Sequence, residues 1–205
     1  MADLPSMVQA ERASLGAYLS TLPPDQWSHS TWCAKWNVQQ VVGHLIAAAN
    51  ITAPHFLAGL IKNGFNFDKV VEGDLVKYAT GTPQEVLRRY EGIIGSTRRP
   101  PGPGYVALGE VMVHSEDIRR AFGSQGEHPV AHVTELLNAY RKTGKPLLGK
   151  RRSAGLRMVA TDFAWEAGEG PEVRGPGMSL ALAIVGRKGA LDDCTGEGVA
   201  ILRSR

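Results

Sequence analysis

Three ionisable residues recur at helical spacing near the middle of the chain: Glu110, His114 and Asp117. Successive residues of an α-helix are about 100° apart, so Glu110 and His114 lie within about 40° of each other on the helix surface, with Asp117 on the same side. That side also carries apolar residues, which predicts that it is buried: Ala107, Val111, Ile118 and Ala121. The opposite side of the helix carries Ser115, Glu116 and Arg119, and it is predicted to point away from the core.

Burying a carboxylate and an imidazole without partners costs several kcal/mol, so this helix face needs an ion, a partner or a hydrogen-bond network. Side chains at i and i+4 have Cβ atoms about 5–6 Å apart, which lets both reach one divalent metal ion. Cores of helical bundles are common places for such sites. The spacing of Glu110 and His114 is therefore consistent with half of a metal site, and also with a plain hydrogen-bonded pair.

A third ligand can come from an earlier helix. His44 lies beside an apolar stripe, on the flank with Val41 and Ala48. A bundle helix touches two neighbours, so this flank can also face inward. His44, Glu110 and His114 then supply two imidazoles and one carboxylate, and three protein ligands with one open position are typical of catalytic zinc. Zn²⁺ is the preferred ion, although such a set also takes Ni²⁺ or Cu²⁺.

Two neighbours of this set leave alternatives open. Asp117 can orient a ligand imidazole, or it can form a salt bridge with Arg120. His55 falls on the same side as His44 only if that helix continues through Pro54, which the proline argues against. The remaining histidines are predicted to lie at the surface: His29, His128 and His132.

The elements that position these residues are four predicted α-helices, over residues 4–22, 37–50, 82–97 and 105–122. Asn37 with Gln40, and Thr82 with Glu85, have the spacing of capping boxes at helix starts. Gly123 is a natural helix end. Four helices of this length predict a bundle over residues 1–123.

The pattern changes after a linker rich in Gly, Gln and Pro at residues 123–130. A helix is predicted over 133–142 and a short apolar helix over 178–185, whereas the Lys150–Arg152 stretch is predicted to be a solvated loop. Short β-like runs follow one another between glycines and prolines, at 156–161, 164–167, 172–174 and 199–202. The fold class is therefore predicted as α+β, with a small C-terminal α+β domain over residues 131–205.

Composition excludes several classes of protein. The 205 residues are 43% hydrophobic and 21% charged, which is typical of a soluble globular chain. The 23 Lys and Arg are spread against 20 Asp and Glu, too evenly for a nucleic-acid-binding face. Neither a signal peptide nor the ~20 apolar residues of a membrane span are found. The chain is predicted to be cytoplasmic, and Cys33 and Cys194 are predicted to be small, buried or partly buried residues rather than nucleophiles.

The segment WCAKWNVQQVVGHL at 32–45 resembles the opening of the mycothiol-dependent maleylpyruvate isomerase family, which belongs to the DinB-like metal-binding four-helix bundles. The segment GEVMVHSEDIRR at 109–120 resembles the second signature of that family. Residues 155–162, 165, 168–175 and 183–187 resemble its appended sterol-carrier-like domain. The chain departs from the family at Ser115, where a glycine is usual, and is shorter than the isomerase itself.

The resemblance implies that His44, Glu110 and His114 ligate a metal, with Zn²⁺ expected and mycothiol as the thiol cosubstrate. The thiol would be activated as a metal-bound thiolate and add to a cis double bond conjugated to a carbonyl. Bond rotation and elimination would then give the trans isomer, as with maleylpyruvate, whereas a leaving group would turn the same chemistry into thiol S-transfer. Arg187 would bind the anionic substrate, or else be a solvated charge at a helix end.

A second hypothesis comes from another class of protein. The α+β domain can mark a non-catalytic protein that binds a small apolar ligand, with the bundle as a metal-stabilised or metal-free scaffold. Metal content separates the two hypotheses, because a purified protein with about one bound metal ion per chain favours the enzyme.

Overall fold

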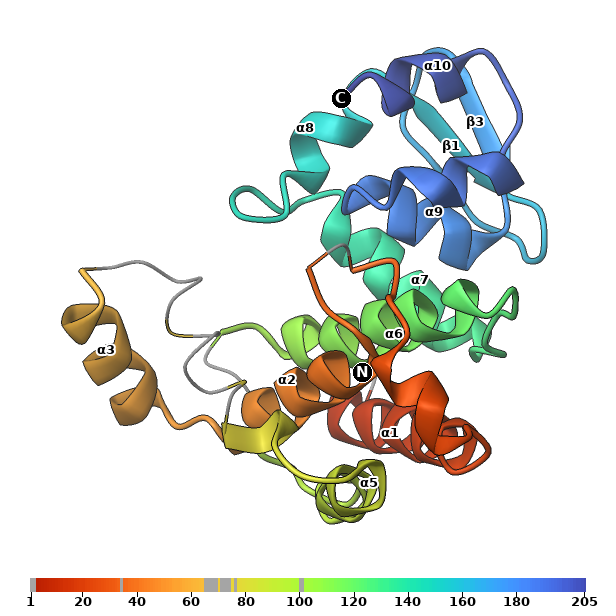
Figure 1. Ribbon diagram of the computed structural model, residues 1–205. Coiled ribbons are helices and arrows are strands. Elements are labelled where there is room, and N and C mark those ends of the chain that lie inside the picture. Colours follow the sequence, from red (N-terminus) through yellow and green to blue (C-terminus); the bar gives the residue numbers. More distant parts are fainter. Residues whose placement is uncertain (1–2, 34, 65–69, 71–74, 76, 100–101) are drawn as a thin grey trace. The chain divides into compact units, whose positions relative to one another are not determined.

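The computed structural model describes residues 3–33, 35–64, 70, 75, 77–99 and 102–205 (Figure 1). The chain divides into two compact units, Met1–Gly126 and Glu127–Arg205. The domains expected from the sequence, 1–123 and 131–205, fall within these units. Helices dominate, and a small three-stranded sheet lies in the second unit, so the α+β fold class is confirmed.

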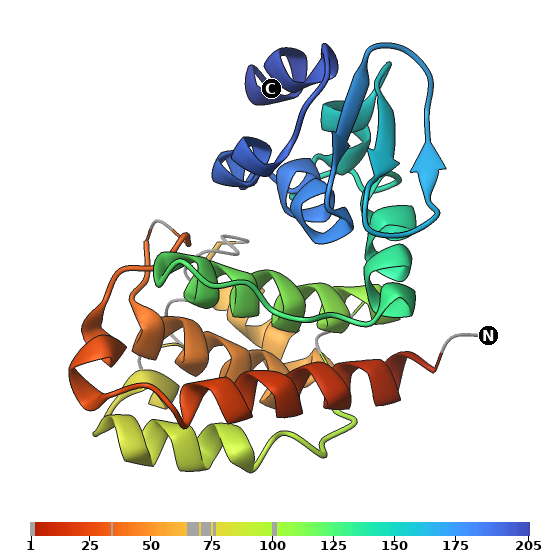
Figure 2. The same ribbon diagram turned by 90° about the vertical axis from the view of Figure 1, so that its right-hand side faces the viewer.

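The first unit is a bundle of four helices, α1 (Leu4–Leu19), α2 (Val38–Asn50), α5 (Pro83–Glu91) and α6 (Gly104–Ala121). Helix α1 packs against α5 and α6, and α2 packs against the same two helices, so each helix has two neighbours (Figure 2). A short 3₁₀ helix, η1 (Pro24–Ser28), lies in the connection from α1 to α2. The four helices predicted in this half are therefore present, although the first and third end earlier than expected.

Both predicted capping boxes are formed. The Asn37 side chain accepts the Gln40 N–H at 2.9 Å, and the Gln40 side chain accepts the Asn37 N–H at 3.0 Å. Thr82 and Glu85 make the same reciprocal pair at the start of α5. Gly123 follows α6 with φ 71°, which favours glycine.

Helix α3 (Ala53–Lys62) was not expected as a separate element. Helix α2 ends at Asn50, and Ile51 is extended with ψ 134°. Pro54 then lies in the first turn of α3, where its missing N–H costs nothing. The proline therefore opens a new helix here.

The expectation that one side of α6 points away from the core was wrong. Ser115 is 2% exposed and Glu116 is 1% exposed, and only Arg119 of that predicted set is half-buried. The reason is that segments outside the bundle also cover α6. The Trp32 N–H donates to the Asp117 carbonyl at 3.0 Å, and the Gly126 N–H donates to the Glu116 carboxylate at 2.6 Å.

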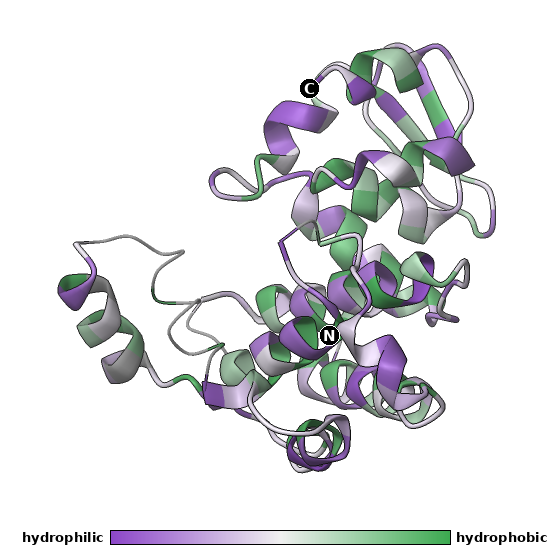
Figure 3. Cartoon of the chain, in the orientation of Figure 1, coloured by the Kyte–Doolittle hydropathy of each residue, from purple (hydrophilic) through white to green (hydrophobic). Residues whose placement is uncertain are grey.

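The second unit begins with helices α7 (Val130–Tyr140) and α8 (Gly149–Ser153). Its sheet has the order β2-β1-β3, with β1 (Arg157–Ala160) antiparallel to β2 (Glu166–Ala167) and parallel to β3 (Glu172–Gly175). Helix α9 (Gly177–Ile184) is buried along its whole length, apolar over most of it (Figure 3), and packs against α7, β1 and β3. The unit ends with η2 (Lys188–Asp193) and α10 (Gly198–Arg203).

Two predictions in this unit were wrong. Residues 199–202, expected to close the sheet, lie in α10, because Gly198 and Leu202 are both buried at the i, i+4 spacing of a helix. The stretch Lys150–Arg152, expected to be a loop, lies in α8. Arg152, the last residue of this stretch, is half-buried, and its guanidinium donates to the Ile184 carbonyl at 3.3 Å.

Among the described residues, no helix combines the length and the apolar character that a membrane span requires.

Candidate metal centre

Helices α2 and α6 bring His44, Glu110 and His114 together. His44 Nε2 lies 2.7 Å from Glu110 Oε2, and His114 Nε2 lies 3.6 Å from the same oxygen. The two imidazole rings meet edge to face with their centroids 5.0 Å apart. One ligand atom from each residue lies within 4.8 Å of the other two, which is the spacing that a single metal ion requires.

The backbone of α2 holds His44 at this place. Asn37 caps the helix, and Val41 and Leu45 are buried on either side of the histidine. Gly43 permits a close approach, because a Cβ atom there would lie 2.8 Å from the Ala79 backbone nitrogen. A side chain at position 43 would therefore push α2 away from the segment beside it.

Asp117 fixes the orientation of the His114 ring. Its Oδ2 lies 2.9 Å from His114 Nδ1, and its side chain is fully buried. A proton on Nδ1 donated to this carboxylate leaves the lone pair of Nε2 directed toward Glu110. Arg120, the other candidate partner of Asp117, donates from Nε to Glu116 at 2.6 Å. The contacts therefore favour the orienting role for Asp117.

Sequence reasoning missed Trp36. Its ring centroid lies 4.8 Å from that of His44 and 6.1 Å from that of His114. The Thr31 hydroxyl donates to the Trp36 carbonyl at 2.8 Å and helps to hold the turn that carries the indole. Its sequence signals were its place in the segment 32–45 and its position directly before the Asn37 cap, which ties it to the start of the helix that bears His44.

Cys33 also reaches this region, which the sequence did not indicate. Its sulfur, a ring nitrogen of His114 and a carboxylate oxygen of Asp117 all lie within 4.8 Å of one another. Both cysteines are half-buried, as expected. Cys194 lies in the second unit, where its thiol contacts the Ala190 carbonyl at 3.6 Å.

The other histidines are not brought to the centre by any described contact. The His55 side chain lies outside the described residues. His29 is exposed, as predicted, and stacks on Phe122. His132 was predicted at the surface but is 8% exposed, because α7 begins at Val130 and places it on a buried helix face. His128 is half-buried.

Arg187 lies in the second unit, half-buried at the start of η2. The positive charge of Arg187 lies close enough to Arg152 to affect the pKa of the Arg152 guanidinium. Burial lowers the pKa of Arg152, and the positive charges of Arg187 and Arg151 lower it further. This corner of the second unit is therefore electropositive.

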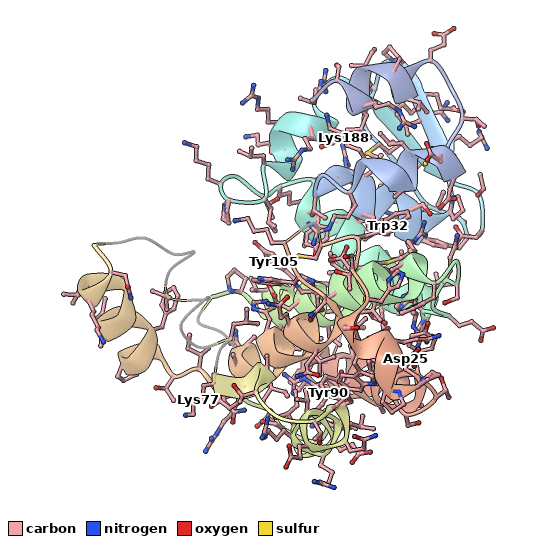
Figure 4. The ribbon with its side chains drawn as sticks, in the orientation of Figure 1. Asp25, Trp32, Lys77, Tyr90, Tyr105 and Lys188 are labelled. Carbon is pink, nitrogen blue, oxygen red and sulfur yellow. The ribbon has the colours of Figure 1, made fainter. Side chains whose placement is uncertain are left out.

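Behind Glu110 the bundle is nearly closed. A cavity of about 10 Å³, room for a single water, is lined by Glu110 with Arg12, Tyr90 and Leu45 among others. Burial lowers the pKa of Arg12, whose guanidinium donates to the Ile93 and Ser96 carbonyls, and raises that of Tyr90. Figure 4 shows Tyr90 within the bundle. The Glu110 side chain is nevertheless 33% exposed, so the ligand group can be reached from elsewhere.

The donor set fits a divalent transition metal. Two imidazoles and a carboxylate suit Zn²⁺, Ni²⁺ or Cu²⁺, and the carboxylate oxygen already lies between the two rings. The buried Asp117 behind His114 is the kind of outer partner that such ligands require.

Comparison with known proteins places part of the chain beside a described family. The family described as mycothiol maleylpyruvate isomerase N-terminal domain matches residues 8–101, a stretch that includes His44 and ends before Glu110. No curated protein matches the chain.

Two solved structures share the fold of the chain. One is the mycothiol-dependent maleylpyruvate isomerase, with a TM-score of 0.66 and 14% identity. The other is a histidine-to-alanine mutant of a protein of that name, with a TM-score of 0.67 and 12% identity. Each likeness covers 95% of this chain and 92% of the other. Residues 8–101 thus resemble the N-terminal domain of the mycothiol-dependent maleylpyruvate isomerase family, and the chain shares the fold of the two isomerase structures.

Proposed function

We propose that the chain is a metal-dependent, thiol-using isomerase with mycothiol as its cosubstrate. The observation that carries the proposal is the convergence of His44, Glu110 and His114, whose ligand atoms lie within 4.8 Å of one another. Three protein ligands leave a position for an outside group, whereas a structural zinc site would have four. The names of the family and of the two similar structures supply the thiol and the reaction class.

Each residue has a distinct task in this proposal. His44 and Glu110 ligate from two helices, and His114 ligates through Nε2 while Asp117 holds its other nitrogen at 2.9 Å. The single carboxylate among the ligands offsets part of the charge of a dication. A divalent metal bound here, Zn²⁺ first, would favour the thiolate form of a small thiol at neutral pH. Trp36 borders the two imidazoles and limits the space around them.

The thiol must approach from the exposed side of Glu110, because the cavity behind it holds about 10 Å³. The sulfur would add to a cis double bond conjugated to a carbonyl, rotation would follow about the resulting single bond, and elimination would return the thiol and the trans product. An electrophile with a leaving group would be converted by thiol S-transfer at the same site. The three ligands serve both reactions equally.

Arg187 is proposed as the residue that binds an anionic substrate. A guanidinium holds a carboxylate through two parallel hydrogen bonds, and the charges of Arg151 and Arg152 add to the local positive potential. Arg187→Ala should then raise KM for an acidic electrophile about tenfold or more and leave that for a neutral one unchanged. The exposed Arg203, paired with Asp192, supplies the control variant Arg203→Ala.

The experiment measures thiol addition or isomerisation by the metal-loaded and metal-free protein. The thiols are mycothiol, bacillithiol and glutathione, each paired with maleylpyruvate and with a generic electrophile. The metal-loaded protein should accelerate at least the mycothiol reaction, and Glu110→Ala should remove the acceleration. Glu91→Ala, at an exposed position on α5, is the matched control. A metal-loaded protein no faster than the metal-free form with every pair would favour a ligand-binding protein instead.

A further inference from the structure

The His114 ring presents ligand groups at both of its nitrogens. On one edge, Nε2 lies 3.6 Å from Glu110 Oε2, in the group that includes His44. On the other edge, Nδ1 lies 2.9 Å from Asp117 Oδ2. The Cys33 sulfur lies within 4.8 Å of this carboxylate and of the ring. Two different sets of three donors therefore share one histidine.

The turn that carries Cys33 is tied to the helix that carries the other two residues. The Trp36 N–H donates to the Cys33 carbonyl at 2.8 Å, and the Cys33 N–H donates to the Thr31 hydroxyl at 3.1 Å. The Trp32 N–H donates to the Asp117 carbonyl at 3.0 Å, and Figure 4 shows Trp32 on this connector. The position of the sulfur is thus set by backbone hydrogen bonds to α6 and within the turn.

We propose that Cys33, His114 and Asp117 form a second metal position that takes thiophilic ions such as Cd²⁺. Thiolate sulfur is a soft ligand and selects such ions, whereas the His44, Glu110 and His114 set contains no sulfur. This inference concerns metal binding by the chain and does not depend on the proposed reaction.

Charge supports the assignment. A Cys33 thiolate and the Asp117 carboxylate together carry two negative charges and match a dication, whereas the first set carries one. Asp117 is fully buried and His114 is 8% exposed. Because burying an unbalanced charge is costly, a set of ligands whose negative charge equals that of the bound dication is favoured here.

The two positions compete. Two dications on opposite edges of one imidazole repel each other strongly at short range. An ion at the Cys33 position also takes Asp117 as a ligand, so that it no longer orients His114 toward the first position. Filling the second position should therefore weaken metal binding at the first.

The test titrates the metal-free full chain with Cd²⁺ alone and follows sulfur-to-cadmium charge-transfer absorption together with metal stoichiometry. His44→Ala removes only the first position, so this variant should keep about one Cd²⁺ per chain and the absorption band. Cys33→Ser should lose the band yet still bind Zn²⁺ through His44, Glu110 and His114. Cys194→Ser, which changes the other half-buried cysteine, should keep the band.

The proposal is overturned if wild-type protein shows no band at saturating Cd²⁺, or if the band survives Cys33→Ser and disappears in Cys194→Ser. Asp117→Asn is the second variant should Cys33→Ser not fold, and it should weaken Cd²⁺ binding in the His44→Ala background at least tenfold. An unchanged affinity there would also overturn the proposal. Loss of Zn²⁺ binding by a folded Cys33→Ser would count against the first position, separately from the result with Cd²⁺.

Discussion

Helix α6 carries two polar sets with the same spacing and different chemistry. Glu110 and His114 lie four positions apart in the sequence, and so do Glu116 and Arg120. Glu116 and Arg120 form a cation–anion pair at 2.6 Å, and Glu116 also accepts the Gly126 N–H. Glu110 instead lies against two imidazoles, those of His44 and His114.

The difference teaches that the partner residue decides what a carboxylate on this helix does. An arginine neutralises Glu116 within the protein, so that set fixes structure. His44 approaches Glu110 from another helix and adds a second nitrogen ligand, so this set can receive a cation. A carboxylate neutralised by the protein and one that can take an added ion should respond differently to substitution.

The largest expected effect on stability comes from Glu116→Gln. Removing the carboxylate takes away the charge that Glu116 supplies to the buried Arg120 guanidinium, and breaking such a pair costs about 3 kcal/mol of unfolding free energy. Urea denaturation of the metal-free protein measures the loss. The matched variant is Glu110→Gln on the same helix, which should change the stability of the metal-free protein much less and abolish stoichiometric Zn²⁺ binding. Equal losses of stability in the two variants would remove the distinction between the sets.

An intermediate effect is expected from Asp117→Asn. The amide still fits the buried position but no longer holds a charged acceptor against His114 Nδ1. Loss of such an outer partner lowers metal affinity by about 10- to 100-fold. Competition with a chromogenic chelator measures the Zn²⁺ affinity, and Asp25→Asn, at an exposed position, is the control. An affinity equal to that of the wild type would show that Asp117 does not orient the ligand.

Features that depend on residues close together in the sequence could be predicted, and features that depend on distant segments mostly could not. The two capping boxes, the helix end at Gly123 and the three strands within residues 156–175 are encoded by neighbouring residues, and these formed as predicted, whereas the run at 199–202 is helical. The convergence of His44 with Glu110 was predicted because an apolar stripe and a bundle determine which helix faces meet.

The failures have one physical cause, which is that distant segments decide burial. Glu116 was placed at the surface because the linker residue Gly126 folds over it only in three dimensions. Cys33 and Trp36 lie on a turn without a periodic pattern, and the hydrogen bond from Trp32 to Asp117 that positions this turn spans a long stretch of sequence. His132 was misplaced because α7 extends three residues closer to the N-terminus than the apolar pattern indicates.

The smallest effect is expected at a polar pair that needs no tertiary partner, Thr82 and Glu85 at the start of α5. Hydrogen bonds from the Thr82 backbone N–H and then its hydroxyl lower the pKa of the exposed Glu85 carboxyl. A pKa lowered by folding gives stability that is present above the unfolded value, near 4.3, and is lost as pH falls through the folded value. Glu85→Gln should therefore lower the urea midpoint slightly at about pH 6, and the difference from wild type should shrink as pH falls below about 4. Glu91→Gln, an exposed change at the other end of α5, is the control. A difference between Glu85→Gln and wild type that stays constant over this range would mean that the hydrogen-bonded shape of the side chain, rather than its charge, stabilises the helix start.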